Sequence, residues 1–300
     1  MYNAIAANKR RTWILMLLFV GFFLGLGYVY GRATMEGQEG GVSGLTIFGV
    51  VAIVYALISY YGSGKLTLAL AHAKEANRQE FFHLYNAVEN LSIASGLPMP
   101  KIYVIDDTAP NAFATGRDPK HAVVAVTTGL LTKLDKSELE GVIAHELSHI
   151  QNYDIRLQSI VVALIGLIAL LSDIFLRNFL WGRRRSDNDR GNGAFVLIGI
   201  ALAILSPIIA KLIGLAVSRQ REFLADASGA MLTRYPEGLA QALQKISADQ
   251  EPLEVANQAT AHLYFANPFK DQHGMKWLHR LFNTHPPVED RIKRLQAINI

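Results

Sequence analysis

Residues 145–149 read His-Glu-Leu-Ser-His, and this pentapeptide decides how the rest of the chain must fold. Residues four apart lie on one face of an α-helix, so the imidazoles of His145 and His149 can reach a single metal ion. Glu146 stands beside a ligand and is expected to face the coordination position left open for water, as a general base. The H-E-x-x-H spacing therefore predicts a helix that binds one Zn²⁺ per chain and supports peptide hydrolysis.

The residues around the motif predict where its helix begins and how it is placed. Ser137 followed by Glu140 has the spacing of a capping box, so we expect the helix to begin at Ser137. Polar residues flank the motif at both ends, which indicates an amphipathic helix that does not itself span a membrane. The apolar residues at helical spacing are Leu139, Val142, Ile143, Leu147 and Ile150.

A catalytic zinc ion takes three protein ligands and keeps one position for water. The chain contains no cysteine, so the third ligand must be His, Asp or Glu. Ile155 stands where a zinc peptidase with three histidine ligands would have its third histidine. The segment 219–226 instead offers Glu222 as the third ligand. Asp226, one helical turn later, is expected to accept the N–H of a ligand imidazole and so to fix its orientation.

Apolar residues are concentrated in four stretches. The chain is 51% hydrophobic and 18% charged, with a mean hydropathy of +0.21, which is too apolar for an ordinary soluble domain. Residues 12–30 and 45–61 are uncharged and predict a transmembrane hairpin. Residues 157–176 and 194–217 predict a second hairpin, although both contain ionisable residues, and a hairpin buried in a soluble domain stays open as the alternative.

These stretches divide the chain into a transmembrane hairpin (1–61), a first catalytic block (62–156), a second hydrophobic hairpin (157–217) and a second catalytic block (218–300). We expect a mainly α membrane protein with four transmembrane helices. Its gluzincin-like metalloprotease domain is expected to be α+β, with a small sheet. Because His149 and Glu222 would share one zinc ion, the region between them must cross the membrane an even number of times.

Basic residues predict the orientation in the membrane. Lys9, Arg10 and Arg11 precede the first apolar stretch, whereas the loop 31–44 holds Arg32 alone, so the N-terminus and the active site should face the cytoplasm. The arginines of the loop 183–190 run against this pattern. The net charge of +4 is small and dispersed, and we expect no nucleic-acid partner.

Four segments occur in an order that resembles the membrane-bound zinc endopeptidases of the HtpX type and, more distantly, the CAAX prenyl endopeptidases. They are Asn111–Gly116, the motif 145–149 with Asn152 and Asp154 after it, the segment 218–226, and Thr284–Pro287 with Arg291. Two apolar stretches before the first catalytic block and two between the ligand helices resemble the HtpX branch, because the prenyl endopeptidases have more spans than this chain can hold.

The resemblance implies further site residues. His285 and Arg291 would stabilise the oxyanion of the tetrahedral intermediate. Asn111, Ala112 and Phe113 would form a strand edge that pairs with the substrate backbone. The pattern of the residues themselves indicates a loop at 111–116, followed by a strand at 121–126 with one face covered.

The resemblance also implies the partners and the location. The substrates would be unfolded or damaged membrane proteins, the enzyme would lie in the lipid bilayer of the bacterial inner membrane, and its role would be stress-linked quality control. Two alternatives remain open: a CAAX-type prenyl-protein endopeptidase, and a membrane scaffold that binds zinc without hydrolysing peptides.

Overall fold

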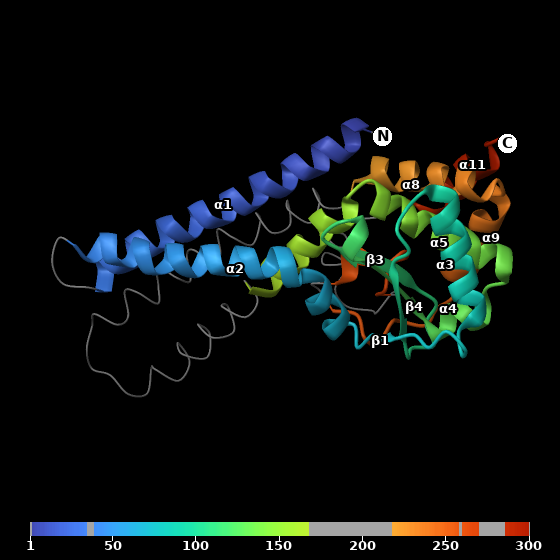
Figure 1. The fold of residues 1–300 in the computed structure, drawn as a ribbon, viewed down its shortest axis with the longest axis horizontal. Helices are drawn as coiled ribbons and strands as arrows, with labels where there is room; N and C mark the ends of the chain where they lie inside the picture. The colour runs from blue at the N-terminus through green and yellow to red at the C-terminus, as the bar shows by residue number, and fades with distance from the viewer. Residues whose placement is uncertain (1, 35–38, 168–217, 258–259, 270–285, 300) are drawn as a thin grey trace.

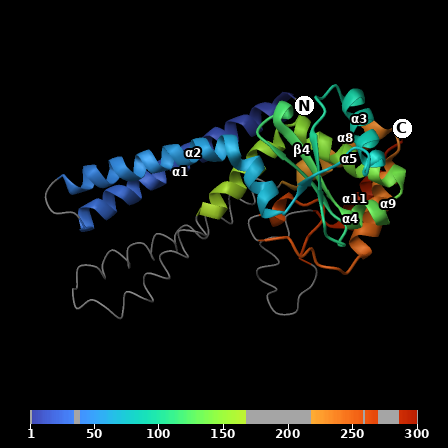
Figure 2. The ribbon, with the colours of Figure 1, turned by 60° about the horizontal axis from the view of Figure 1, so that its bottom comes forward.

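The computed structural model describes residues 2–34, 39–167, 218–257, 260–269 and 286–299. Two long helices, α1 (Tyr2–Thr34) and α2 (Gly40–Leu70), extend side by side from a globular unit that holds the sheet and the other labelled helices (Figure 1). The N-terminal end of α1 lies against the globular unit, and α2 returns the chain to it (Figure 2).

Helices α1 and α2 contain the two predicted N-terminal spans. Each is long and apolar enough to cross a membrane, over Ile5–Arg32 and Gly40–Leu70. Large apolar side chains on both helices face outward, and Leu17 is 70% and Ile58 61% exposed. An apolar surface of this kind is stable in contact with lipid, so these helices support the prediction of a membrane protein.

Glycines let α1 and α2 approach closely. A Cβ atom placed on Gly44 would lie 2.1 Å from the carbonyl oxygen of Gly27, and one on Gly31 would lie 2.1 Å from that of Gly40. These distances leave no room for a side chain between the two backbones. Small residues at a helix–helix contact are typical of membrane hairpins, where close packing replaces the hydrophobic effect.

The structure describes only part of the second predicted hairpin. Residues 154–167 are helical, and Leu157, Ile160, Val161 and Leu164 pack against the apolar side chains of α1 and α2. The remainder of the 157–176 stretch, the whole 194–217 stretch and the arginine loop 183–190 lie outside the described residues. Of the four predicted transmembrane helices, the structure describes two, α1 and α2. The other two stay a prediction.

The globular unit contains a four-stranded sheet in the order β1-β2-β4-β3. Strand β1 (Lys74–Glu75) runs antiparallel to β2 (Lys101–Ile105), β2 runs parallel to β4 (Ala122–Thr127), and β3 (Ala112–Gly116) runs antiparallel to β4. Strand β3 therefore forms one edge of the sheet. The prediction of a mainly helical fold with a small sheet is confirmed.

Two details of the expected sheet were wrong. The segment expected to be a loop at 111–116 is largely strand β3, because it pairs along its length with β4. The strand expected to have one covered face is buried on both. Alternate residues of β4 pack on α5 (Lys136–Gln151) and α3 (Phe82–Ser95), while Val123 and Ala125 pack on the end of α2 and on η2 (Ala261–Leu263).

Helix α5 carries the motif and begins earlier than predicted. Asp135 caps it, accepting from the backbone N–H of Glu138, and the Glu138 carboxylate accepts from the N–H of Asp135. The capping box is therefore Asp135 and Glu138, not Ser137 and Glu140. The second half of α5 is buried all round because α3, β3, α8 (Arg219–Thr233) and α9 (Pro236–Ala248) pack on it, so it is not the amphipathic helix expected.

We expect Gly44→Ala to destabilise the α1–α2 hairpin, by about 1–3 kcal/mol for an overpacked contact, because its methyl group would collide with the Gly27 carbonyl. Gly21→Ala is the matched control, since a Cβ there meets nothing within 4 Å among the described residues. It should be neutral or stabilising, as alanine favours helices. Thermal unfolding in detergent measures both, and equal melting temperatures would contradict the packing described.

Candidate metal centre

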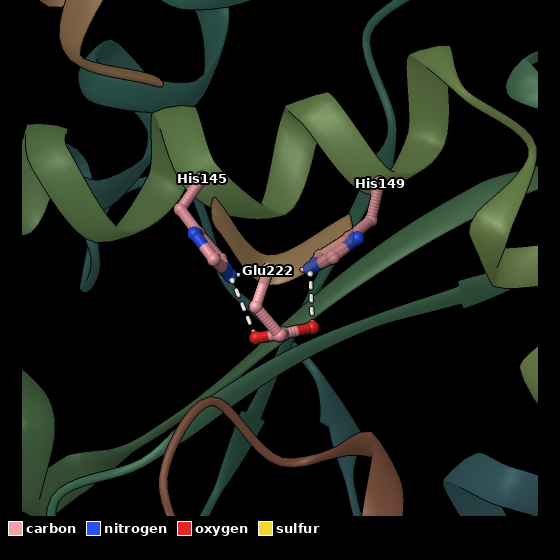
Figure 3. Close-up of side chains that lie close together, drawn as sticks. All are labelled: His145, His149 and Glu222. Atoms are coloured by element: carbon pink, nitrogen blue, oxygen red, sulfur yellow. Dashed lines mark hydrogen bonds and ion pairs between the residues drawn. The ribbon is translucent and has the colours of Figure 1, made fainter. Parts of the chain in front are cut away.

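Three buried side chains from two helices converge on one point (Figure 3). His145 and His149 project from α5, and their Nε2 atoms lie 3.1 Å apart. Glu222 of α8 faces both, with Oε2 3.7 Å from His145 Nε2 and Oε1 3.6 Å from His149 Nε2. The structure therefore brings together the three residues predicted as metal ligands.

The spacing of these atoms fits a tetrahedral zinc site. Zinc–nitrogen and zinc–oxygen bonds of about 2.0–2.2 Å at tetrahedral angles separate neighbouring ligand atoms by about 3.3–3.6 Å. The Nε2–Nε2 separation of 3.1 Å is close to that range, as are the distances from Glu222, 3.7 Å through Oε2 to His145 and 3.6 Å through Oε1 to His149. All three side chains are at most 6% exposed. Two imidazoles and one carboxylate also form a donor set that catalytic zinc uses, with a fourth position left for water.

A glycine on α8 allows this convergence. A Cβ atom on Gly229 would lie 3.0 Å from the backbone nitrogen of His145, so the two helices touch through their backbones at this point. Glu222 and Asp226 lie seven and three residues before Gly229 and therefore share its face of α8. The close approach at Gly229 is what brings both carboxylates within reach of α5.

Asp226 orients the first histidine, as its position one turn after Glu222 predicted. Its Oδ1 lies 2.9 Å from His145 Nδ1, on the ring edge opposite Nε2. Arg291 of α11 (Val288–Gln296) donates to the same carboxylate through Nε at 2.8 Å and Nη2 at 2.7 Å. Burial would raise the pKa of Asp226, but the charge and hydrogen bonds of Arg291 lower it to about 2, so it stays an acceptor. Burial lowers the pKa of His145 to about 4. For His149, burial also lowers the pKa, but the hydrogen bond to Asp154 and the charge of Glu222 raise it to about 9.

Asp154 contacts the second histidine in the same way, a role that the sequence had not assigned to it. Its Oδ2 lies 3.0 Å from His149 Nδ1. Tyr153, with φ of 60°, lies in the two-residue turn after α5, and Asp154 follows it at the start of the next helical segment. Asn8 of α1 donates to Asp154 Oδ1 at 2.6 Å and to the Asn152 carbonyl at 3.0 Å. Helix α1 therefore contacts Asp154, the residue that hydrogen-bonds the metal ligand His149.

Glu146 lies in the protein interior and is 2% exposed. Burial raises its pKa to about 7, against the opposing effects of His149 and of a hydrogen bond from the Ala114 backbone. A carboxylate with a pKa near neutrality is suited to accept a proton and release it again.

The residues predicted to bind substrate or the oxyanion lie in three different places relative to the metal centre and the described residues. Asn111, Ala112 and Phe113 lie at the start of the edge strand β3 and are buried. His285 lies outside the described residues. Arg291 was expected to face the oxyanion, but its guanidinium is paired with Asp226 on the Nδ1 side of His145, away from Nε2. Its position favours orienting Asp226 over contacting the oxyanion.

Comparison with known proteins agrees with this geometry. The profile of Peptidase family M48 matches residues 78–299. The chain belongs to peptidase family M48. Membership makes it a metalloprotease and counts against a scaffold that does not hydrolyse peptides. Helices α1 and α2, which are long and apolar enough to cross a membrane, support a membrane metallopeptidase.

Full-length relatives support the assignment. The "Protease HtpX homolog" of Dictyoglomus thermophilum is 49% identical over 297 residues, which cover 99% of this chain and 94% of the relative. That of Tropheryma whipplei strain Twist is 46% identical over 299 residues, covering 99% and 98%. The crystal structure of S. mikatae Ste24p has a TM-score of 0.52 at 18% identity and covers 99% of this chain and 67% of that chain, so it shows a shared fold.

We expect Asp154→Asn to weaken metal binding by roughly tenfold or more, because it removes the charge that supports His149 as a ligand. Competition with a fluorescent zinc chelator measures the affinity. Asp118→Asn is the matched control, since Asp118 pairs with the exposed His121 at 2.7 Å, outside the metal centre. Equal affinity of the Asp154 variant and the unaltered protein would contradict the role of Asp154.

Proposed function

We propose that this protein is a zinc endopeptidase of the bacterial inner membrane that cleaves unfolded or damaged membrane proteins at an active site facing the cytoplasm. The observation that carries the proposal is the convergence of His145, His149 and Glu222 beside the buried carboxylate of Glu146 and the sheet edge β3.

The reaction divides among these residues. His145, His149 and Glu222 would hold zinc, which when bound lowers the pKa of water towards neutrality and polarises the scissile carbonyl. Glu146 accepts the proton of the attacking water at its carboxylate and passes it to the leaving amine. Asp226 and Asp154 accept from the Nδ1 atoms of the two histidines and keep their Nε2 atoms directed at the ion. His285 is proposed, by resemblance alone, to stabilise the oxyanion.

The contact between α1 and the metal centre supports the proposed orientation. Asn8 binds Asp154, so the N-terminal end of α1 and the ligand His149 lie on the same side of any membrane that α1 crosses. Lys9, Arg10 and Arg11 follow directly at this end, and basic residues favour the cytoplasmic side. We therefore assign the active site to the cytoplasmic side.

The edge position of β3 supports unfolded substrates. Pairing with an edge strand uses the main-chain groups of a peptide, which are available only where the substrate is extended. Because this binding mode uses main-chain hydrogen bonds of the substrate, it accepts substrates of many different sequences. Unfolded segments of membrane proteins meet this requirement near the bilayer, and we propose them as the substrates.

We expect Glu146→Gln to lower cleavage of unfolded β-casein by about 10²–10⁴-fold, because the amide cannot accept the proton, while bound zinc is retained. The measurement compares detergent-purified proteins for peptide release and for zinc content by atomic emission. Glu140→Gln, on the same helix and facing Lys136 at 3.9 Å, is the matched control and should cleave normally.

Equal cleavage by the Glu146 variant and the unaltered protein would assign the activity to a contaminant. Zinc binding without cleavage by either would contradict the peptidase proposal. A parallel assay with prenylated and plain peptides of one sequence tests the prenyl alternative, and cleavage that depends on the prenyl group would overturn the proposed substrates.

A further inference from the structure

A short stretch of the chain itself lies against the start of the edge strand β3, beside the metal centre. Tyr264-Phe265-Ala266 follows η2, and Tyr264 has the extended dihedral angles φ −68° and ψ 144°. The backbone N–H of Phe265 donates to the Ala112 carbonyl at 2.8 Å. The N–H of Ala266 donates to Asn111 Oδ1 at 3.2 Å, and Asn111 Nδ2 donates back to the Ala266 carbonyl at 3.1 Å.

The side chain of Phe265 contacts one metal ligand, His145. Its ring centre is 5.0 Å from that of His145, nearly perpendicular to it at 88°, and the Arg291 guanidinium carbon lies 4.9 Å from the ring centre. Arg291 Nη1 also donates to the Phe265 carbonyl at 3.4 Å. Phe265 is 1% exposed, so its ring fills an enclosed space between His145 and Arg291.

These contacts recognise a peptide backbone and one apolar side chain. The main-chain groups of residues 265–266 are bonded by Ala112, Asn111 and Arg291, and the first two belong to the edge predicted to pair with substrate. Any extended peptide carries the same main-chain groups. Two rings of the segment depend on its sequence: Phe265 lies against His145, and Tyr264 packs edge-on against Phe113 of β3 at 5.3 Å.

We infer that Tyr264-Phe265-Ala266 occupies the place of a substrate peptide on β3, so that the chain carries its own competitor at the active site. A substrate takes this place by displacing the segment, with a large apolar side chain in the space that Phe265 fills. The inference rests on the proposed peptidase function and adds to it the residue class that the site selects. Apparent substrate affinity is then reduced by the fraction of molecules in which the segment is bound.

Phe265→Ala tests the competition. We expect it to lower KM for unfolded β-casein by about three- to tenfold, with a smaller change in kcat, because the weakened segment leaves the edge more often. Phe82→Ala is the control, since Phe82 is 54% exposed on α3 and its ring packs edge-on against His83, outside the metal centre. Its KM should stay within about twofold of the unaltered protein.

A second measurement does not depend on the folding of a variant. The peptide acetyl-Leu-Tyr-Phe-Ala-Asn-amide, which copies residues 263–267, should inhibit the unaltered protein competitively. The same peptide with alanine in place of phenylalanine should inhibit at least about fivefold more weakly, because it lacks the side chain that fills the enclosed space. Mass spectrometry of casein fragments should show large apolar residues next to the cleaved bonds.

The outcomes separate the two proposals. If the unaltered protein cleaves casein and Glu146→Gln does not, the peptidase function stands. An unchanged or raised KM in a folded Phe265→Ala protein, or no competitive inhibition by either peptide, then overturns the competitor alone. If the unaltered protein cleaves nothing, the peptidase function is overturned, and the competitor with it.

Discussion

The backbone contact between α5 and α8 is the constraint on which the metal centre depends. One helix supplies two imidazoles and the other supplies two carboxylates, and neither set is a site without the other. Gly229 permits the approach because any larger residue would meet the backbone of His145. The chain between the two helices covers residues 152–218, so the site joins segments that are distant in sequence.

Burial explains why so many charged groups surround two histidines. An unpaired charge in a protein interior costs several kcal/mol, and removal of one partner of a buried pair typically costs about 3–5 kcal/mol. Asp226 is paired by Arg291 from the C-terminal helix, and Asp154 is bonded by Asn8 from the N-terminal helix. Both ends of the chain therefore stabilise the orientation of the ligands. The Asn8 contact also connects the hairpin α1–α2 to the active site.

The edge strand β3 is the proposed place both for substrate binding and for its restriction by the chain itself. An edge strand with unpaired main-chain groups pairs with any extended peptide, and proteins commonly protect such edges. Here the protecting stretch is the chain's own 264–266, which also contacts His145 and Arg291. A peptidase with an open edge would bind many unfolded chains. A competitor within the molecule limits cleavage to substrates that bind the edge more strongly.

The sequence by itself predicted the ligand set, which the structure brings together, the two N-terminal helices that could span a membrane, and the roles of Glu146 and Asp226. Each depends on local spacing: four residues for His145 and His149, four for Glu222 and Asp226, and long uncharged runs for the helices. Only the tertiary structure decided the contacts between distant segments. Asp154 reaches His149 through a turn at Tyr153, Arg291 pairs with Asp226 away from Nε2, and residues 265–266 bond to Asn111 and Ala112 at the start of β3. No period or motif encodes such contacts, because they depend on which surfaces pack together, and packing is a property of the whole chain.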